Sequence, residues 1–221
     1  MKYRISLAVL SLLLHLTSFG QGRHAKIFQV AAHGKYQSGW YTLQDGTRHA
    51  AKLRIWQTLT SNLVQVDQGK ADPINLSPEV LRCFTMGSDS FIVARQVAVA
   101  GMPTLKPFAE TDIYRVVLTG KLQVLEHDQL VVKQGLYGPS QSHEGAWLLR
   151  PEGTTDLVIV PAVDKAFAQH IAPFFVENPA LAQRIRAGLL GIGDFERIVY
   201  AYVFKKEIEH VSYEEAGTIF R

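Results

Sequence analysis

The sequence predicts an α+β protein in which a mainly antiparallel, barrel-like β part comes first and a three-helix segment follows it. Short runs of β-branched and aromatic residues, separated by turn residues, fill positions 39–162. Beyond Pro161 the apolar residues recur at helical spacing. Strands that precede helices, and do not alternate with them, favour α+β over a parallel α/β sheet.

Residues 1–20 have the order of a secretory signal peptide. Lys2 and Arg4 supply positive charge, residues 5–16 form an apolar run, and the small residues Ser18 and Gly20 precede the expected cleavage before Gln21. At about 1.5 Å per residue the run covers about 18 Å, less than the roughly 30 Å of a hydrocarbon core. We therefore expect an exported protein, periplasmic or at the cell surface, with no transmembrane segment in the mature chain.

Composition narrows the classes of partner. The formal charge of +3 falls to +1 when Lys2 and Arg4 are removed. Because nucleic-acid binding requires a clustered basic face, we expect no nucleic-acid partner. The single cysteine, Cys83, cannot form an internal disulfide and lies too far from the apolar run to carry a lipid anchor. Its apolar neighbours predict a small buried hydrophobe.

After a polar lead-in at residues 21–38, turn signals divide positions 39–162 into short strands. Asp45-Gly46 predicts a hairpin turn, since both residues tolerate positive φ. Residues 52–56 alternate polar and apolar, which predicts one buried face. Ser77-Pro78 predicts a single helical turn. Strands are expected at residues 27–30, 39–43, 52–56, 62–66, 74–76, 84–86, 91–97, 113–118, 122–126, 129–133, 147–150 and 157–160, with loops at 98–107 and 134–146.

Three short helices are expected in residues 163–210, followed by a tail at 211–221. Asn178-Pro179 is a capping residue followed by proline at the first helical position, and Asp194 is a second capping signal. Gly188 and Gly191 mark the end of the middle helix. Helices this short are unstable alone, so they must pack on the sheet or on one another.

No sequence motif identifies a catalytic or metal site. The histidines beyond residue 20 lack the spacing of a metal pair, and we predict neither a metal nor a cofactor. No Gly-x-Ser-x-Gly elbow is present, and the glycine-rich run at residues 188–193 does not follow a strand, so it predicts a turn between helices. The histidines are His24, His33, His49, His127, His143, His170 and His210.

Two histidines have an adjacent carboxylate in the sequence. His127-Asp128 and His143-Glu144 can each pair a general base with an acid, although neighbours in a turn or loop are more often solvated. Glu110 and Asp112 flank Thr111 and are expected to face water at the start of a strand.

Aromatic residues concentrate on the expected strands. Trp40, Tyr41, Trp56 and Trp147 are expected in the core or in cross-strand pairs. The alternative is an exposed stacking surface for a sugar or peptide partner.

Four segments carry a resemblance to known sequences: residues 39–47, 114–122, 174–181 and 198–202. Together with the leader, they resemble a group of uncharacterised exported proteins of Bacteroidota, in which a Gly-Tyr-aliphatic-Thr…Gly-Asp-Thr hairpin opens the mature domain and an Asn-Pro-x-Leu helix closes it. This chain differs at residues 44–47, where the group has Gly-Asp-Thr, and at 124–125, where it often has tyrosine. The resemblance implies export and domain layout.

The function expected from the sequence is therefore a non-enzymatic envelope protein that binds another envelope protein or a glycan. The alternative is a hydrolase acting on an envelope polymer, with acid and base supplied by residues such as His127, Glu110 or Asp112. The sequence assigns no catalytic residue and does not identify the ligand-binding residues.

Overall fold

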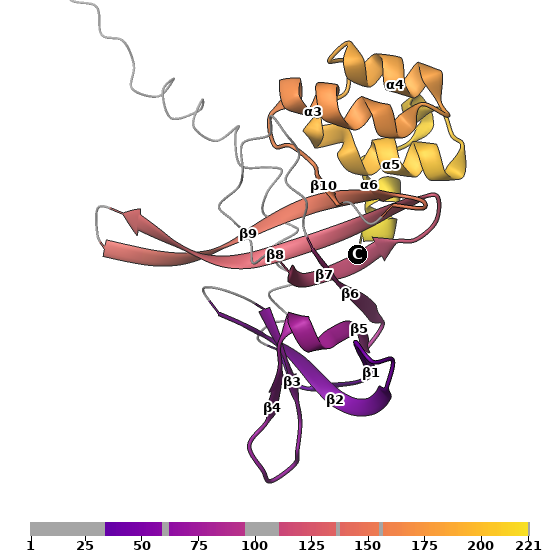
Figure 1. The fold of residues 1–221 in the computed structure, drawn as a ribbon. Helices are drawn as coiled ribbons and strands as arrows, with labels where there is room; N and C mark the ends of the chain where they lie inside the picture. Colours follow the sequence, from indigo (N-terminus) through magenta and orange to yellow (C-terminus); the bar gives the residue numbers. More distant parts are fainter. Residues whose placement is uncertain (1–33, 59–61, 96–110, 136–137, 155–156, 221) are drawn as a thin grey trace, which may run out of the picture.

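The computed structural model describes residues 34–58, 62–95, 111–135, 138–154 and 157–220. The fold is α+β, as the sequence predicts: a ten-stranded antiparallel sheet is followed by a helical segment (Figure 1). The strand order is β10-β9-β8-β7-β6-β5-β1-β2-β3-β4, so the sheet is open, with β10 and β4 at its ends. The strands are β1 Gln37–Leu43, β2 Arg48–Gln57, β3 Asn62–Val66, β4 Ile74–Leu76, β5 Leu81–Met86, β6 Asp89–Arg95, β7 Thr111–Leu118, β8 Leu122–Gly135, β9 Gly138–Pro151 and β10 Val158–Ile159.

The N-terminal strands β1–β6, with Ile113 of β7, enclose a separate core. The hairpin of β1 and β2 turns at the predicted Asp45-Gly46, where Gly46 has φ 88° and Asp45 Oδ1 accepts from the Thr47 N–H at 2.8 Å. Gly39 allows β1 to approach β5, because a Cβ there would lie 1.9 Å from the carbonyl oxygen of Thr85. The buried members of this core are Leu53, Ile55, Val64, Val66, Leu81, Phe84, Met86, Phe91 and Ile113.

The hairpin of β8 and β9 differs from the sequence prediction. The expected break between 122–126 and 129–133 and the expected loop at 134–146 are replaced by two strands of 14 residues each, paired from Leu122–Pro151 to Gly135–Gly138. Pairing with β8 outweighs the weak strand preference of the serines and glycines in β9, as tertiary context commonly does.

The helical segment covers one face of β8 and β9 (Figure 1). It comprises α3 (Asp164–Ile171), α4 (Pro179–Arg186), α5 (Phe195–Phe204) and α6 (Tyr213–Ala216), with 3-10 turns at Ala172–Phe175, Ile192–Asp194, Ile208–His210 and Gly217–Phe220. The predicted cap at Asn178 is confirmed, because its side chain accepts from the Leu181 N–H. The Asp194 side chain does not cap α5 and instead accepts from the Gly191 N–H.

The helical part extends beyond the expected boundary at residue 210. Residues 211–220, expected as a tail, contain α6 and a 3-10 turn, and Phe220 is buried against Trp147 at 5.0 Å between ring centroids. The gain from burying this ring accounts for the order of the C-terminus.

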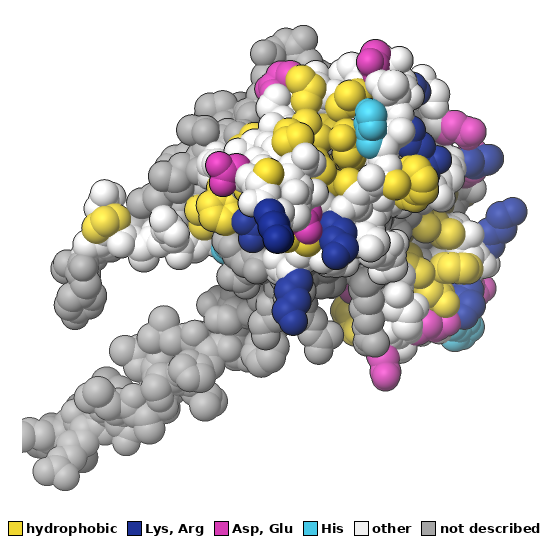
Figure 2. All heavy atoms as spheres, turned by 90° about the horizontal axis from the view of Figure 1, so that it is seen from below, with side chains coloured by type: hydrophobic (Ala, Val, Ile, Leu, Met, Phe, Trp, Pro, Cys, Tyr) yellow, Lys and Arg dark blue, Asp and Glu magenta, His cyan; other side chains and the backbone are white. Residues whose placement is uncertain are grey.

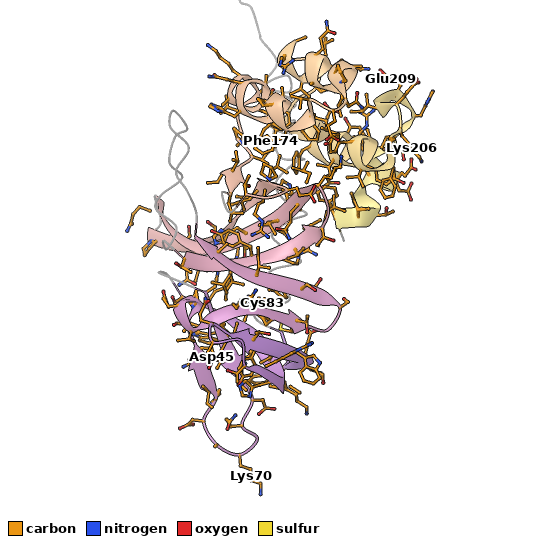
Figure 3. The ribbon with its side chains drawn as sticks, turned by 45° about the vertical axis from the view of Figure 1, so that its right-hand side comes forward. Asp45, Lys70, Cys83, Phe174, Lys206 and Glu209 are labelled. Carbon is orange, nitrogen blue, oxygen red and sulfur yellow. The ribbon has the colours of Figure 1, made fainter. Side chains whose placement is uncertain are left out.

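The N-terminal strands lie at one end of the molecule and the helical segment at the other (Figure 3). Figure 3 shows Asp45 and Lys70 at the turns of the N-terminal strands, with Lys206 and Glu209 on the helical side. Cys83 lies between them on β5 as a half-buried free thiol, more exposed than predicted. Among the described helices, each is too short or too polar to cross a membrane. Residues 1–20, the strand expected at 27–30 and the loop expected at 98–107 lie outside the described residues.

Candidate functional site

The strands β1 and β2 present one face to their core and the other to solvent. Side chains alternate along a strand, and in β2 Leu53, Ile55 and Gln57 are buried while Lys52 and Trp56 are exposed. Cross-strand registers continue the outer side onto β3, where Gln65 is buried, and onto β4, where Asn75 is exposed. We name the solvent side the outer aromatic face and define it by Tyr36, Trp40, Arg48, Lys52, Arg54, Trp56, Gln65 and Asn75.

Trp40 stands on β1 with its ring in solvent. The residue is 47% exposed, and its cross-strand partner is the small Ala50, which leaves the ring uncovered. The Arg48 guanidinium lies 4.7 Å from the ring centroid, in cation–π contact. One side of the indole is therefore held by an arginine on the neighbouring strand.

Arg54 organises a second aromatic group on the same face. Its guanidinium lies 4.7 Å from the Tyr36 ring and 5.4 Å from the Trp56 ring, and Trp56 is 42% exposed. Arg54 Nε donates to Gln65 Oε1 at 2.7 Å, and Gln65 Nε2 donates to Asn75 Oδ1 at 2.8 Å. This row of contacts crosses from β2 to β4 and fixes the plane of the guanidinium.

The cations of the outer aromatic face contact no carboxylate among the described residues. Arg48, Lys52 and Arg54 form no ion pair there, and Asp67, one residue past β3, uses its Oδ1 to accept from the Gly69 N–H. Seen from below, the molecule carries lysine and arginine side chains beside hydrophobic ones (Figure 2). The face thus combines exposed aromatic rings with positive charge that no described acid neutralises.

The prediction for the aromatic residues is half confirmed. Trp147 is buried and Tyr41 packs against the N-terminal core, as expected. Trp40 and Trp56 are not in the core, and the interpretation as an exposed stacking surface fits them. Sequence alternation identified the exposed side of β2 but could not identify which side of β1 faces the core.

A second candidate site is a buried cluster of histidines and carboxylates near the start of β7. The His127 Nε2 lies 2.8 Å from Asp112 Oδ2, and the His143 Nδ1 lies 2.7 Å from Asp128 Oδ2. The four side chains are between 1% and 9% exposed. Asp112 was expected to face water but is buried. It lies where β7 meets the β2–β3 hairpin, since Asn62 at the start of β3 donates to it.

The sequence leaves two interpretations of His127-Asp128, a general base beside its acid or two solvated neighbours, and the structure shows neither, since both side chains are buried and each bonds another residue. The two residues are neighbours on β8, and neighbours on a strand point to opposite faces. Each therefore bonds a residue from another position: His127 bonds Asp112 on β7, and Asp128 bonds His143 on β9. Glu110 lies outside the described residues, and so does the side chain of Glu144.

Two amides from the β2–β3 hairpin complete the cluster. Gln57 Nε2 donates to Asp128 Oδ2 at 3.1 Å, and Asn62 Nδ2 donates to Asp112 Oδ1 at 3.2 Å. Burial raises the pKa of Asp128, and the hydrogen bonds from His143 and Gln57 oppose this shift. The cluster joins the ends of the N-terminal strands to β7 and β8 in a position closed to solvent.

Sequence reasoning missed a further buried ion pair. Arg115 Nε lies 2.6 Å from Glu126 Oε2, and its Nη2 donates to the carbonyl oxygen of Phe220 at 3.2 Å. Both side chains are nearly inaccessible. The sequence signal for this pair is a single charged residue in each of two successive expected apolar strands, Arg115 in one and Glu126 in the next.

A groove of about 990 Å³ lies between the β7–β8 turn and helices α4 and α5. Its Lys121 pairs with Glu177 and its Arg184 pairs with Glu209, so the charges along this groove are largely neutralised. Among the described residues, no three His, Cys, Asp or Glu side chains converge as a metal ion requires.

The remaining sequence candidates lie apart. His49 stacks on Tyr41, while His170 and His210 lie on the helical side, and His24 and His33 lie outside the described residues. The glycine-rich run at 188–193 lies between α4 and α5, as predicted. Comparison of the chain with protein-family models, with curated proteins and with solved structures finds no match.

Proposed function

We propose that this chain is an exported, non-enzymatic binding protein of the cell envelope, and that the outer aromatic face is its ligand-binding surface. The observation that carries the proposal is the exposure of Trp40 and Trp56 on one sheet face, each beside an arginine. The leader-like order of residues 1–20 supports export.

A tryptophan ring exposed on a sheet face adds little stability to the fold unless a ligand covers it. A large ring left in water forgoes the hydrophobic gain of burial, and exposed apolar surface rimmed by polar residues commonly marks an interaction site. Tryptophan and arginine are also the residues that dominate binding energy at interfaces. Because hydrogen bonds hold Arg54 in place, less conformational freedom is lost when a ligand binds.

The hydrolase alternative is favoured by one distance, the 2.8 Å between His127 and Asp112, since a base oriented by a carboxylate is a common catalytic pair. Burial opposes it, because a polymer cannot reach side chains that are 1% and 4% exposed. Turnover of an envelope polymer that the His127→Asn variant loses, while remaining folded, would establish the alternative.

The proposal is tested by site-specific photo-cross-linking in intact cells. A photo-reactive benzoylphenylalanine replaces Ala50, which is exposed on the outer aromatic face, and a matched control replaces Leu189, which is exposed on the helical side. We expect an adduct at position 50 and none at 189, with loss of the adduct when Trp40→Ala and Trp56→Ala are added. N-terminal sequencing of the recovered protein is expected to start at Gln21.

Equal labelling at both positions, or no adduct at position 50, contradicts the assignment of the surface. Recovery of an uncleaved chain among cytosolic proteins contradicts export. Circular dichroism of the purified variants establishes that the tryptophan substitutions leave the fold intact.

A further inference from the structure

We propose that the ligand of the outer aromatic face is an acidic glycan, a polysaccharide that carries carboxylates; the inference rests on the proposed function and names its ligand class. Sugar rings stack on Trp40 and Trp56, while Arg48, Lys52 and Arg54 bind the carboxylates. Three properties of the face support this ligand: its charge, its exposed aromatic rings and its length.

The charge of the face calls for an anion. Some cations elsewhere in the described residues lie against acids: Lys206 contacts Glu215, and Arg197 contacts Asp194. On the outer aromatic face, by contrast, the described strand residues include three cations and no carboxylate. Arg54 uses Nε for Gln65, and its two terminal nitrogens make no hydrogen bond or ion pair among the described residues, which leaves them for a ligand. A guanidinium presents them as a fork that matches a carboxylate.

The aromatic rings select the class of anion. The C–H groups on the face of a sugar ring are weakly positive and stack on the negative face of an indole. A protein partner instead inserts side chains into pockets at its strongest contacts. The two pockets at the β7–β8 and β9–β10 turns are lined by other residues than those of this face. Exposed rings on a sheet face therefore suit a glycan better than an acidic peptide.

The spacing of the tryptophans favours a polymer. Trp40 pairs with Ala50, which lies six positions from Trp56 along β2. At about 3.3 Å per residue the backbone positions that carry the two tryptophans are separated by roughly 20 Å along the strand, more than a single sugar covers. Lys52 and Arg54 lie between position 50 and Trp56 on β2, and the Arg48 guanidinium lies against the Trp40 ring, so a chain that reaches both rings passes or meets all three cations.

The inference is tested with purified mature protein and three polymers in a titration calorimeter. Polygalacturonate supplies sugar rings with carboxylates, its methyl ester supplies the same rings without charge, and poly-L-glutamate supplies the charge without sugar. We expect binding of polygalacturonate, with binding of the other two polymers weaker by about tenfold or more. Equal binding of the methyl ester overturns the role of the cations, and equal binding of poly-L-glutamate overturns the glycan.

Variants localise the binding. Trp40→Ala with Trp56→Ala, and separately Arg48→Gln, are expected to weaken polygalacturonate binding by about tenfold or more. The matched control is Arg186→Gln on α4, an exposed arginine on the helical side that should leave binding unchanged. If no acidic polysaccharide binds while the cross-link at position 50 persists in cells, the inference about the ligand is wrong and the proposed function stands. If the cross-link is also absent, both are wrong.

Discussion

Tryptophan and arginine occur in two settings in this molecule, and the settings differ in what surrounds each side chain. At the interface between the sheet and the helices, Trp147 packs on Phe220 and Arg115 pairs with Glu126 out of contact with water. On the outer aromatic face, Trp40 is exposed, and the Trp40 ring is the side-chain partner of Arg48 among the described residues. The first setting holds the fold together. The second leaves the same kinds of side chain in contact with solvent.

The tryptophans provide the largest expected contrast in stability. Trp147→Ala opens a cavity between β9 and the helices and should lower the free energy of unfolding by about 3–5 kcal/mol. Trp40→Ala should lower it by less than about 1 kcal/mol, because an exposed ring loses little on truncation. Urea denaturation of the two variants measures both values, and a Trp40→Ala cost as large as that of Trp147→Ala would show that the outer ring is structural.

The arginines sharpen the contrast through charge. Arg115→Ala leaves the buried carboxylate of Glu126 without its cation and should destabilise the protein by about 3–5 kcal/mol. Adding Glu126→Gln to that variant should recover part of the loss, since it removes the buried negative charge that Arg115 faces. Arg48→Ala is the matched control and should change the stability by about 0.5 kcal/mol or less. The comparison fails if the two single variants unfold at the same denaturant concentration.

Two aspartates extend the contrast to pH. Burial raises the pKa of Asp128, so its ionisation opposes folding: its contribution is most favourable below the ordinary pKa of 3.8 and is lost as the pH rises through the raised value. Asp45 behaves oppositely, because hydrogen bonds from Thr47 lower its pKa. Its stabilisation is present above 3.8 and is lost as the pH falls through the lowered value.

The stability difference between the wild type and Asp128→Asn should therefore decrease with rising pH, whereas the difference for Asp45→Asn should increase. Chemical denaturation at several pH values around 3.8 measures both slopes. Slopes of the same sign would contradict the assigned environments.

Local signals in the sequence predicted the parts of the fold that depend on a few neighbouring residues. The Asp45-Gly46 turn, the helical turn after Ser77 and the Asn178 cap need no distant partner. The long β8–β9 hairpin was missed because its outer half is held by pairing between strands and not by strand-forming residues. The position of Phe220 was missed because the rings that cover it are distant in the sequence.

The candidate sites show the same division. Sequence reasoning selected His127, Asp112 and Asp128 but offered for His127 only its neighbour or solvent, since the strand alternation that separates His127 from Asp128 depends on β8 continuing past the expected turn. It selected Trp40 and Trp56 as aromatic strand residues, but their exposure depends on which face the core of β1–β6 occupies. The stacking of Arg48 and Arg54 depends on strand register, which no local motif encodes.

The bridge from Gln57 to Asp128 spans 71 positions of the chain, and this separation has a consequence for the order of folding. Contacts between distant positions form slowly, because a long loop must close before they contribute any stability. During synthesis, which starts at the N-terminus, β1–β3 can pair locally. Gln57 and Asn62 have no carboxylate to bond until β7 and β8 have also been synthesised. The N-terminal strands therefore reach their final form late, and the outer aromatic face matures only when the middle of the chain is in place.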